Sequence, residues 1–294
     1  MMASKEVVRQ ELVSPLGEPL LSIKEITFKD LHTPAQSAMY TVLFVKEGKG
    51  LYHADFGTFP FSAPALLFST PLQVIYLDQS ESVKCTQLQF HGDFYCIEFH
   101  RKEVRCNGLL FNNIYVDPIV TLTEKEAKVF DKLVDDLKEE LNHETLSDIV
   151  PRAYLQLFLA KSSSIKMNAS SNKNNDSERD DLMEQFSQLL DEHYLTLRKS
   201  SDYAGLLSMS RDNFTRRCTR YFRKSPSQLI QEKLILEAKK QLHLTRQSIK
   251  EIAYNLQFQD EFYFSRVFKK FTKVSPQAFR DKTGISIVAD MSKD

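Results

Sequence analysis

The residues with the clearest chemical potential are polar and basic side chains that recur in two segments of the chain. Residues 213–216 read Asn-Phe-Thr-Arg, and residues 263–266, at a spacing of 50, read Tyr-Phe-Ser-Arg. A Ser-Pro step follows each of them, at 225–226 and 275–276. An arginine side chain can donate two parallel hydrogen bonds to O6 and N7 of guanine, the commonest base-specific contact in DNA recognition. This internal repeat predicts two similar units whose polar faces suit the edges of DNA bases.

Each copy of the repeat has the pattern of two short helices joined by a turn. In the second copy, apolar residues at helical spacing precede and follow a short turn at 257–259. These residues are Ile249, Ile252, Ala253 and Leu256, followed by Phe264, Val267, Phe268 and Phe271. In the first copy, Ala204 and Leu207 match Ala253 and Leu256 at a spacing of 49. The pattern predicts two helix-turn-helix units, with one residue inserted in the second turn.

The second helix of each copy has a polar side opposite its apolar stripe. In the first copy this side holds Arg211, Asp212, Thr215, Arg216 and Thr219, opposite Phe214, Cys218 and Tyr221. In the second copy it holds Glu261, Phe262, Ser265, Arg266 and Lys269. A helix in the major groove meets base edges with its N-terminal half, so we expect Lys269, Lys270 and Lys273 beside phosphates. Arg217 is an exception, because it takes the inward position of Val267.

Charge is divided unequally along a chain whose formal net charge is zero. Residues 196–285 carry 19 Lys and Arg against 8 Asp and Glu, whereas residues 1–195 carry 19 against 29. A basic module on an acidic body indicates a polyanion as the partner of the module. A helix over about 226–242, roughly 25 Å long, is expected to link the two copies. Major-groove segments on one face of DNA recur every ~34 Å, so one subunit is expected to reach two of them.

A Ser- and Asn-rich stretch at 162–177 predicts a flexible linker between two domains. Before it, short β-branched and aromatic runs over 20–120 predict an antiparallel β-sandwich or β-barrel. A capping box at Thr123 and apolar residues at helical spacing predict a helical hairpin over about 123–161. Residues 1–161 would then form a sensory or dimerisation domain. The candidate dimerisation residues are Val129, Leu133, Leu137 and Leu141.

After the linker, residues 178–285 are expected to form an all-α, DNA-binding domain, followed by a tail at 286–294. Two helix-turn-helix subdomains joined by the linking helix would make up this domain. The fold class predicted for the whole chain is therefore α+β with two domains, a β-barrel with a helical hairpin and an all-α domain.

The stretch LILEAKKQLHLTRQSIKEIAYNLQFQDEFYFSRVFKKFTKVSPQAFR, residues 234–280, resembles the AraC/XylS family of bacterial transcription regulators. The resemblance covers about 180–285 and implies two helix-turn-helix subdomains joined by a linking helix. It also implies base contacts from Asp212, Thr215 and Arg216, and from Glu261, Phe262, Ser265 and Arg266. Arg211, Thr219 and Arg220 join the three lysines as expected phosphate contacts.

The chain departs from this family at three positions where the family usually has glycine. Gln257 stands in the second turn, and Arg223 and Lys273 stand before the Ser-Pro steps. If these positions need a positive φ angle, a long side chain costs roughly 1 kcal/mol at each. The departures affect the expected local geometry and leave the expected fold unchanged.

Residues 48–77 resemble the cupin-type β-barrel that is often fused to this DNA-binding module. In ligand-regulated members the barrel holds a small molecule, and the helices after it dimerise. Catalytic cupins bind metal through a His-x-His pair with a later Glu and His. Here His53 stands alone in the equivalent stretch, and His91, Glu98 and His100 lie near one another later in the sequence. A metal site needs three or more converging ligands. We therefore expect no metal and no cofactor. The sequence has no phosphate-binding loop, nucleophile elbow or HExxH helix, so we also expect no enzymatic activity.

The four cysteines, Cys85, Cys96, Cys106 and Cys218, form no CxxC pair and are expected to be free thiols in the cytoplasm. The expected function is sequence-specific binding of double-stranded DNA by a transcription regulator, with no membrane partner. RNA polymerase, a small-molecule effector and a second copy of the chain are further candidate partners. One alternative is a regulator that acts through protein contacts without a small-molecule effector. Another is an enzymatic cupin fused to the DNA-binding domain.

Overall fold

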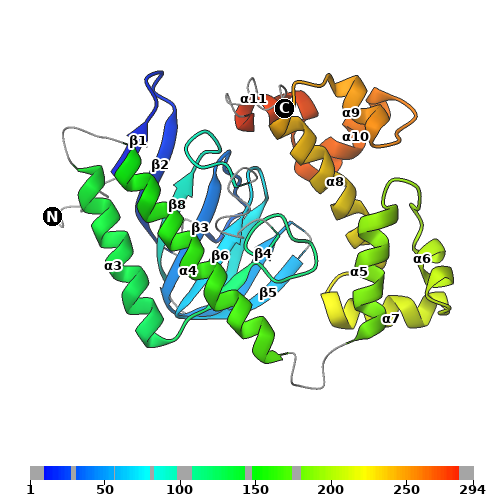
Figure 1. Ribbon diagram of the computed structural model, residues 1–294, viewed down its shortest axis with the longest axis horizontal. Coiled ribbons are helices and arrows are strands. Elements are labelled where there is room, and N and C mark those ends of the chain that lie inside the picture. Colours follow the sequence, from blue (N-terminus) through cyan, green and yellow to red (C-terminus); the bar gives the residue numbers. More distant parts are fainter. Residues whose placement is uncertain are drawn as a thin grey trace. The chain divides into compact units, whose positions relative to one another are not determined.

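The structure is a computed structural model that describes residues 10–27, 31–55, 57–79, 83–97, 108–142, 148–173 and 180–284. The chain divides into two compact units (Figure 1). The N-terminal unit comprises Met1–Ala54, Phe59–Asn112 and Pro118–Ser170, and the C-terminal unit comprises Asp55–Thr58, Asn113–Asp117 and Ser171–Asp294. Strands dominate the N-terminal unit and helices dominate the C-terminal unit, which confirms the predicted α+β class.

The β-part of the N-terminal unit consists of two antiparallel sheets, with the strand orders β1-β2-β8-β3-β6-β9 and β5-β4-β7 among the described residues. The strands are β1 Gln10–Val13, β2 Pro19–Thr27, β3 Tyr40–Glu47, β4 Lys49–Ala54, β5 Gly57–Ser62, β6 Ala65–Ser69, β7 Ile75–Gln79, β8 Lys84–Phe90 and β9 Ile119–Thr121. The chain changes sheet at Gly48, whose φ is 100°, so the consecutive strands β3 and β4 belong to different sheets. Antiparallel strands are therefore confirmed, and the predicted cupin-like barrel is corrected to two separate sheets.

Strand β3 shows why both sides of the larger sheet are buried. Val42 and Phe44 belong to an apolar cluster that includes residues of the helices, whereas Leu43 and Val45 belong to a cluster between the two sheets. Successive side chains of a strand point to opposite faces. A continuous run of β-branched and aromatic residues therefore suits a strand that is covered on both sides.

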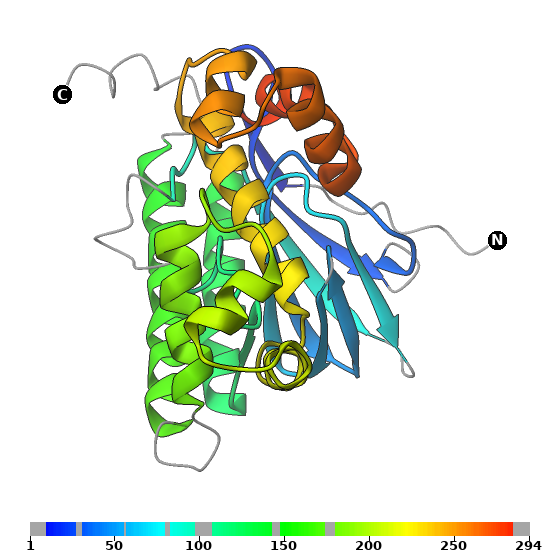
Figure 2. The same ribbon diagram turned by 90° about the vertical axis from the view of Figure 1, so that its right-hand side faces the viewer.

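Two long helices, α3 Glu124–Leu141 and α4 Ile149–Lys173, lie side by side next to the larger sheet (Figures 1 and 2). They confirm the predicted helical hairpin. The predicted capping box is also present, because the Thr123 amide donates to Glu126 Oε2 at 2.7 Å and the Thr123 hydroxyl accepts from the Glu126 amide at 3.3 Å. This reciprocal pair satisfies two amides that the first turn of the helix leaves unbonded.

Helix α4 continues to Lys173, through most of the residues that were predicted to form the linker. Two polar side chains of this stretch are tied into the N-terminal unit. The Ser162 hydroxyl donates to the Phe158 carbonyl at 2.9 Å, and Lys166 Nζ donates to the Ile119 carbonyl at 3.0 Å. The Ser- and Asn-rich composition hides these contacts, so the linker prediction is corrected: the helix extends where a flexible chain was expected.

The candidate dimerisation residues occupy the inner face of α3. Leu133, Leu137 and Leu141 are buried in the core of their own unit, together with residues of α4 and the larger sheet. Only Val129 of the four is exposed, at 40%. Side chains that are already covered within one unit cannot cover a second copy, so the structure corrects the prediction for the three leucines.

The C-terminal unit is helical. Its helices are α5 Asp181–His193, α6 Ser200–Leu206, α7 Arg211–Phe222, α8 Pro226–Leu244, α9 Ile249–Asn255, α10 Glu261–Thr272 and α11 Pro276–Thr283. We call α5–α7 the first helix-turn-helix unit and α9–α11 the second. Helix α8 has 19 residues and is about 28 Å long at 1.5 Å per residue. It packs on both units, since Leu229 and Ile230 join the core of the first and its contacts with α9 and α11 serve the second.

The turns of the two helix-turn-helix units have the same hydrogen bonds. Ser208 and Gln257 both have positive φ angles, of 53° and 57°. The amide of the residue after each one donates back to a helix carbonyl, from Met209 to Ala204 at 2.8 Å and from Phe258 to Ala253 at 2.9 Å. This arrangement is a Schellman motif, which ends a helix with one residue in the left-handed region.

Left-handed residues also end α7 and α10, the two helices that are predicted to be the recognition helices. Arg223 after α7 and Lys273 after α10 have φ angles of 57° and 65°. All three positions at which the resembling family usually has glycine therefore have a positive φ, the condition on which the expected steric cost depended. The second turn is one residue longer, which confirms the predicted insertion. The cap of α10, Asp260, lies three residues after the left-handed Gln257, whereas the cap of α7, Ser210, lies two residues after the left-handed Ser208.

An ion pair explains the charged residue on the inner side of α7. Arg217 donates through Nε and Nη2 to the two carboxylate oxygens of Asp180, at 2.9 and 2.6 Å. Asp180 also caps α5, because Oδ1 accepts from the Met183 amide at 3.3 Å. Burial raises the pKa of Asp180, but the bonds from Arg217 and the Met183 amide outweigh burial and lower this pKa below its ordinary value.

The cysteines described by the structure are buried free thiols at positions 85, 96 and 218, as expected, and Cys106 lies outside the described residues. Burial raises the pKa of Cys218 to about 12 and also raises that of Cys85. Both thiols therefore stay protonated at neutral pH. Among the described residues, the helices are too short or too polar to cross a membrane.

The left-handed turn residue gives a first testable prediction. Replacing Gln257 with glycine should raise the free energy of unfolding by about 0.5–1 kcal/mol, because glycine adopts a positive φ without steric strain. The matched control, Lys269→Gly in the right-handed interior of α10, should lower it by about 1 kcal/mol. Urea unfolding followed by circular dichroism at 222 nm measures both. A loss of stability in Gln257→Gly would contradict the assigned turn geometry.

The Asp180–Arg217 pair gives a prediction about pH. The folded-state pKa of Asp180 is lowered, so its contribution to stability is present near neutral pH and is lost as the pH falls through that pKa. The difference in Tm between the wild type and Asp180→Asn should therefore shrink between about pH 6 and about pH 3. Asp212→Asn removes an exposed carboxylate of the same unit and serves as the control. A pH-independent difference would mean that the cap bond alone stabilises the unit.

Candidate nucleic-acid interface

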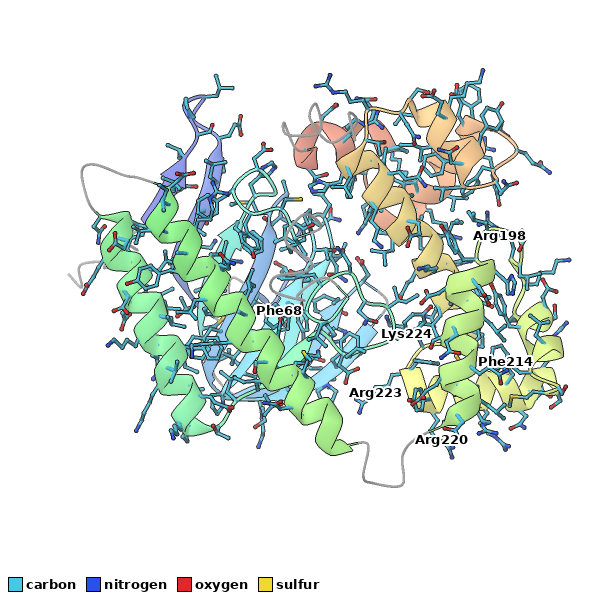
Figure 3. The ribbon with its side chains drawn as sticks, viewed as in Figure 1. Phe68, Arg198, Phe214, Arg220, Arg223 and Lys224 are labelled. Atoms are coloured by element: carbon cyan, nitrogen blue, oxygen red, sulfur yellow. The ribbon has the colours of Figure 1, made fainter. Side chains whose placement is uncertain are left out.

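Helix α7 presents the polar face that was predicted for the first copy. The exposed side chains are Arg211, Asp212, Thr215, Arg216, Thr219 and Arg220, so the predicted base and phosphate contacts of this helix all share the solvent side. Phe214 and Cys218 are buried on the opposite side, as expected. Phe222, rather than the predicted Tyr221, completes the buried stripe. Figure 3 shows Phe214 among the helices of the first unit and Arg220 at its edge.

Helix α10 presents a more apolar face. Phe262 and Arg266 are exposed, whereas Glu261 and Ser265 are half-buried. Lys269, Lys270 and Lys273 are exposed at the C-terminal end of the helix, where phosphate contacts were predicted. The structure therefore brings the predicted residues of α10 onto one side, with two of the four base-contact candidates less accessible than the others.

Exposed aromatic rings mark the start of α10. Phe262 is 71% exposed and Tyr263 is 50% exposed. The Arg266 guanidinium lies over the Tyr263 ring, 5.9 Å from its centre, so the ring can hold the arginine by a cation–π contact. An exposed phenylalanine can contact the methyl group of thymine in the major groove. Tyr263 was not among the predicted site residues, although it directly follows Phe262.

Side-chain caps hold the N-terminal ends of both recognition helices. The Ser210 hydroxyl accepts from the Asn213 amide at 3.4 Å, and Asp260 Oδ1 accepts from the Tyr263 amide at 2.7 Å. The caps define where each helix begins and therefore where its first exposed side chains lie. The N-terminal end of a helix also carries a partial positive charge that favours phosphate.

Aromatic packing fixes the rotation of each recognition helix about its axis. In the first unit, the Phe186 ring contacts the rings of Phe214 and Tyr203, with centroids 4.9 and 5.4 Å apart. In the second unit, Phe264 contacts Phe258 and Phe268, with centroids 5.1 and 5.8 Å apart. Because these rings face inward, the polar residues on the other side of each helix must face outward.

A short segment from the first half of the chain completes the core of the first unit. Residues Asn113–Asp117, which we call the strap, belong to the C-terminal unit although both neighbouring stretches belong to the other one. Ile114 is a member of the buried cluster that contains Phe214. The Tyr115 hydroxyl donates to Asp191 Oδ1 at 2.9 Å and to the Ser187 carbonyl at 3.2 Å. Burial raises the pKa of Tyr115, so its hydroxyl remains a donor.

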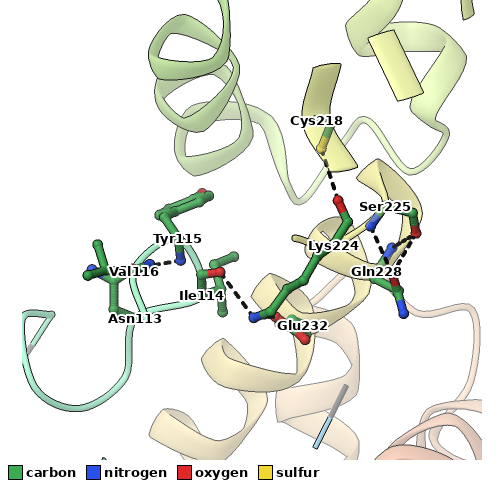
Figure 4. Close-up of polar contacts among 9 residues, drawn as sticks. All are labelled: Asn113, Ile114, Tyr115, Val116, Cys218, Lys224, Ser225, Gln228 and Glu232. Carbon is green, nitrogen blue, oxygen red and sulfur yellow. Dashed lines mark hydrogen bonds and ion pairs between the residues drawn. The ribbon is translucent and has the colours of Figure 1, made fainter. Parts of the chain in front are cut away.

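A buried ion pair joins the strap to the start of α8 (Figure 4). Lys224 Nζ lies 2.6 Å from Glu232 Oε2 and donates to the Ile114 carbonyl at 3.1 Å. Burial raises the pKa of Glu232, and the adjacent Lys224 opposes this rise. Lys224 was counted only as part of the basic charge of the module, because no local pattern connects it with a residue 110 positions earlier.

The candidate metal ligands do not form a site in the part of the chain that the structure describes. His53 stacks on Tyr76 with ring centroids 4.1 Å apart, and His91 lies beside Asp93. Glu98 and His100 lie outside the described residues. Within those residues, His, Cys, Asp and Glu side chains form no cluster of three that could hold a metal ion.

Residues 203–282 match a protein-family model described as a helix-turn-helix domain. The chain is also similar to the raffinose operon transcriptional regulatory protein RafR of Pediococcus pentosaceus, with 29% identity over 96 residues. The matched part is 33% of this chain and 35% of RafR. The chain therefore spans about a third of the length of this curated relative.

One solved structure is similar to about a third of the chain, and another is similar to most of it. The C-terminal domain of AraT, a response regulator from Geobacillus stearothermophilus, shows 26% identity and a TM-score of 0.35, covering 37% of this chain and 92% of that domain. ToxT from Vibrio cholerae with bound unsaturated fatty acid shows 18% identity and a TM-score of 0.40, covering 90% of this chain and 95% of ToxT.

The matched residues begin in α6 and end in α11, so they contain both turns together with α7, α8, α9 and α10. The N-terminal unit of strands lies outside the match. Residues 203–282 of this chain are therefore similar to a helix-turn-helix domain.

Proposed function

We propose that this protein is a transcription regulator that binds duplex DNA sequence-specifically, with α7 and α10 in two adjacent major-groove segments. The observation that carries the proposal is the duplicated recognition helix. Each copy has a capped N-terminal end, a buried phenylalanine as its fourth residue and a left-handed residue after its last turn. Each exposes an arginine one turn from its start, Arg216 in α7 and Arg266 in α10.

The chemistry of the two faces supports different roles for the two helices. The α7 face offers Arg216 with Thr215 and Asp212, which suits hydrogen bonding to base edges. The α10 face combines Arg266 with the exposed ring of Phe262, which suits guanine next to thymine. The half-buried Glu261 and Ser265 would reach DNA only at close approach, so we rank them below Arg266 and Phe262 as base contacts.

Lysines and arginines around these faces supply the electrostatic part of binding. Arg211 and Arg220 lie on α7, and Lys269, Lys270 and Lys273 lie at the end of α10. Neutralising phosphates releases bound counterions, so affinity should fall steeply as salt rises. These side chains would position the protein on DNA and contribute little to the choice of sequence.

Control of DNA binding through the N-terminal part of the chain is a further element of the proposal. The strap supports it, because Ile114 and Tyr115 are packed into the first helix-turn-helix unit. A change in the chain on either side of the strap would therefore act on the same core that holds α7. A small-molecule effector, RNA polymerase and a second copy of the chain are the partners to be tested in this role.

A second candidate is a regulator that acts through protein contacts without a small-molecule effector. Buried apolar side chains occupy the space between the two sheets, among them Tyr52, Phe59, Phe61, Leu67 and Leu77. This packing favours the second candidate. A compound that raised Tm with a concentration dependence typical of a bound ligand would instead favour an effector.

Selection from random duplexes with the full-length protein, at about 0.15 M salt, tests the main proposal. The full chain is the right material, because a fragment that begins after residue 177 lacks the strap. We expect a motif of two boxes whose centres lie about one helical turn apart. Enrichment of no sequence would mean that the basic surface binds DNA by charge alone and would overturn the proposal.

Two alanine variants test the assignment of base and phosphate contacts. Arg266→Ala should cost about 1–3 kcal/mol on the selected site and relax specificity at one base pair. Lys269→Ala should weaken binding to all sequences alike and reduce the slope of log affinity against log salt by about 1. Titrations against the selected duplex and single-base variants of it measure both effects. A base-selective effect of Lys269→Ala would contradict its assignment to phosphate.

A further inference from the structure

One side chain of the first helix-turn-helix unit reaches into the turn of the second. Arg198 lies between α5 and α6, and its guanidinium donates to the carbonyl of Leu256, at the end of α9. The same guanidinium lies over the Phe258 ring, 5.5 Å from its centre. Figure 3 marks Arg198 at the border between the helices of the two units. The two units are therefore joined by this contact as well as by α8.

The first-unit end of this contact is anchored. The residue before Arg198, Leu197, has its carbonyl held by the Tyr203 hydroxyl at 3.1 Å. Tyr203 is fully buried and stacks edge-on against Phe186 in the core of the first unit. The residue after Arg198, Lys199, caps α6, since its amide donates to Asp202 Oδ2 at 3.3 Å. The backbone that carries Arg198 therefore moves with the first unit.

The second-unit end is anchored in the same way. Leu256 is fully buried, and its amide donates to the Ile252 carbonyl at 3.0 Å. Its carbonyl is one of the last in α9, which have no partner within the helix and carry partial negative charge. A guanidinium that satisfies such a carbonyl makes a charge-assisted hydrogen bond at the helix end that favours cations. Gln257 and Phe258, which follow, form the turn into α10.

This second connection limits how the two recognition helices can move relative to each other. A single helix such as α8 joins the two units along one line, and bending or twisting near its ends would change the separation of α7 and α10. The Arg198 contact is separate from α8 and links the segment before α6 to the turn before α10. Two separate connections between the helix-turn-helix units oppose a relative rotation that a single connection would permit.

We propose that Arg198 is a positioning residue that locks the turn of the second helix-turn-helix unit to the first and thereby sets the spacing of the two DNA boxes that the protein accepts. The inference rests on the proposed function, because spacing matters only if both recognition helices contact one duplex. One base pair inserted between the boxes moves the second by about 3.4 Å and turns it by about 35°. A locked pair of units cannot follow both changes without strain.

The test uses the full-length protein and the duplex recovered by selection, together with versions in which one or two base pairs are inserted between the boxes. We expect wild-type affinity to fall about tenfold or more on the first insertion. Arg198→Met should lose about tenfold on the original spacing and should discriminate far less between the spacings. Binding to a duplex with a single box should stay within about twofold of the wild type.

Two further variants separate positioning from charge and from general damage. Arg198→Lys keeps the charge but lacks the planar guanidinium, so it should recover affinity in part without recovering discrimination. Arg246→Met removes an exposed arginine from the loop between α8 and α9 and should leave the ratio of affinities for the spacings unchanged. Full discrimination in Arg198→Met would overturn the proposal.

Hydrogen exchange without DNA distinguishes failure of this inference from failure of the proposed function. Loss of the Arg198 contact should speed exchange of the Gln257 and Phe258 amides several-fold, while the Ser208 and Met209 amides of the first turn keep their wild-type rates. If no two-box duplex is found but the second turn loses protection, the lock is real and the DNA function is wrong. Unchanged exchange at Gln257 and Phe258 would overturn the lock whatever the DNA result.

Discussion

The exposed faces of the recognition helices depend on the burial of one phenylalanine in each, Phe214 in α7 and Phe264 in α10. Both rings are fully buried, and Phe214 contacts the Phe186 ring whereas Phe264 contacts the rings of Phe258 and Phe268. Each residue of a helix is rotated by about 100° from the last, so burying this ring determines which residues face solvent. Arg216 and Arg266, each two positions further on, are placed on the outer side for that reason. Caps and left-handed ends then determine where each helix starts and stops.

The two units achieve the same geometry with different interactions. The first unit combines its aromatic core with charge, through the Asp180–Arg217 pair on one side of α7 and the buried Lys224–Glu232 pair after it. The second relies on apolar packing, through a chain of ring contacts from Phe258 to Phe279. Breaking a buried ion pair leaves an uncompensated charge, which is strongly destabilising. The first unit is therefore the more sensitive to pH.

Local patterns in the sequence were enough to predict the repeat, the caps and the inserted turn residue, because each depends on residues within a few positions. They were not enough for features that depend on distant partners. The pairing of β3 with β6 and β8 separates two sheets where a barrel was expected. Likewise, Lys166 and Ser162 hold α4 in a stretch whose composition is typical of a linker. Apolar residues on α3 indicated a buried face but could not show which surface buries it.

The strap has a consequence for how the chain folds during its synthesis. Ile114 leaves the ribosome well before Lys224, which lies 110 residues later, so at about 5–20 residues per second the two are separated by roughly 5–20 seconds. Within that interval Tyr115 first lacks both of its partners, because Asp191 is made 76 residues later and Phe222 later still. Until then its apolar neighbours are open to solvent or to other chains. The core of the first helix-turn-helix unit therefore needs two stretches of chain that are made at different times. Nascent chains are most exposed to misassembly between the synthesis of these two stretches.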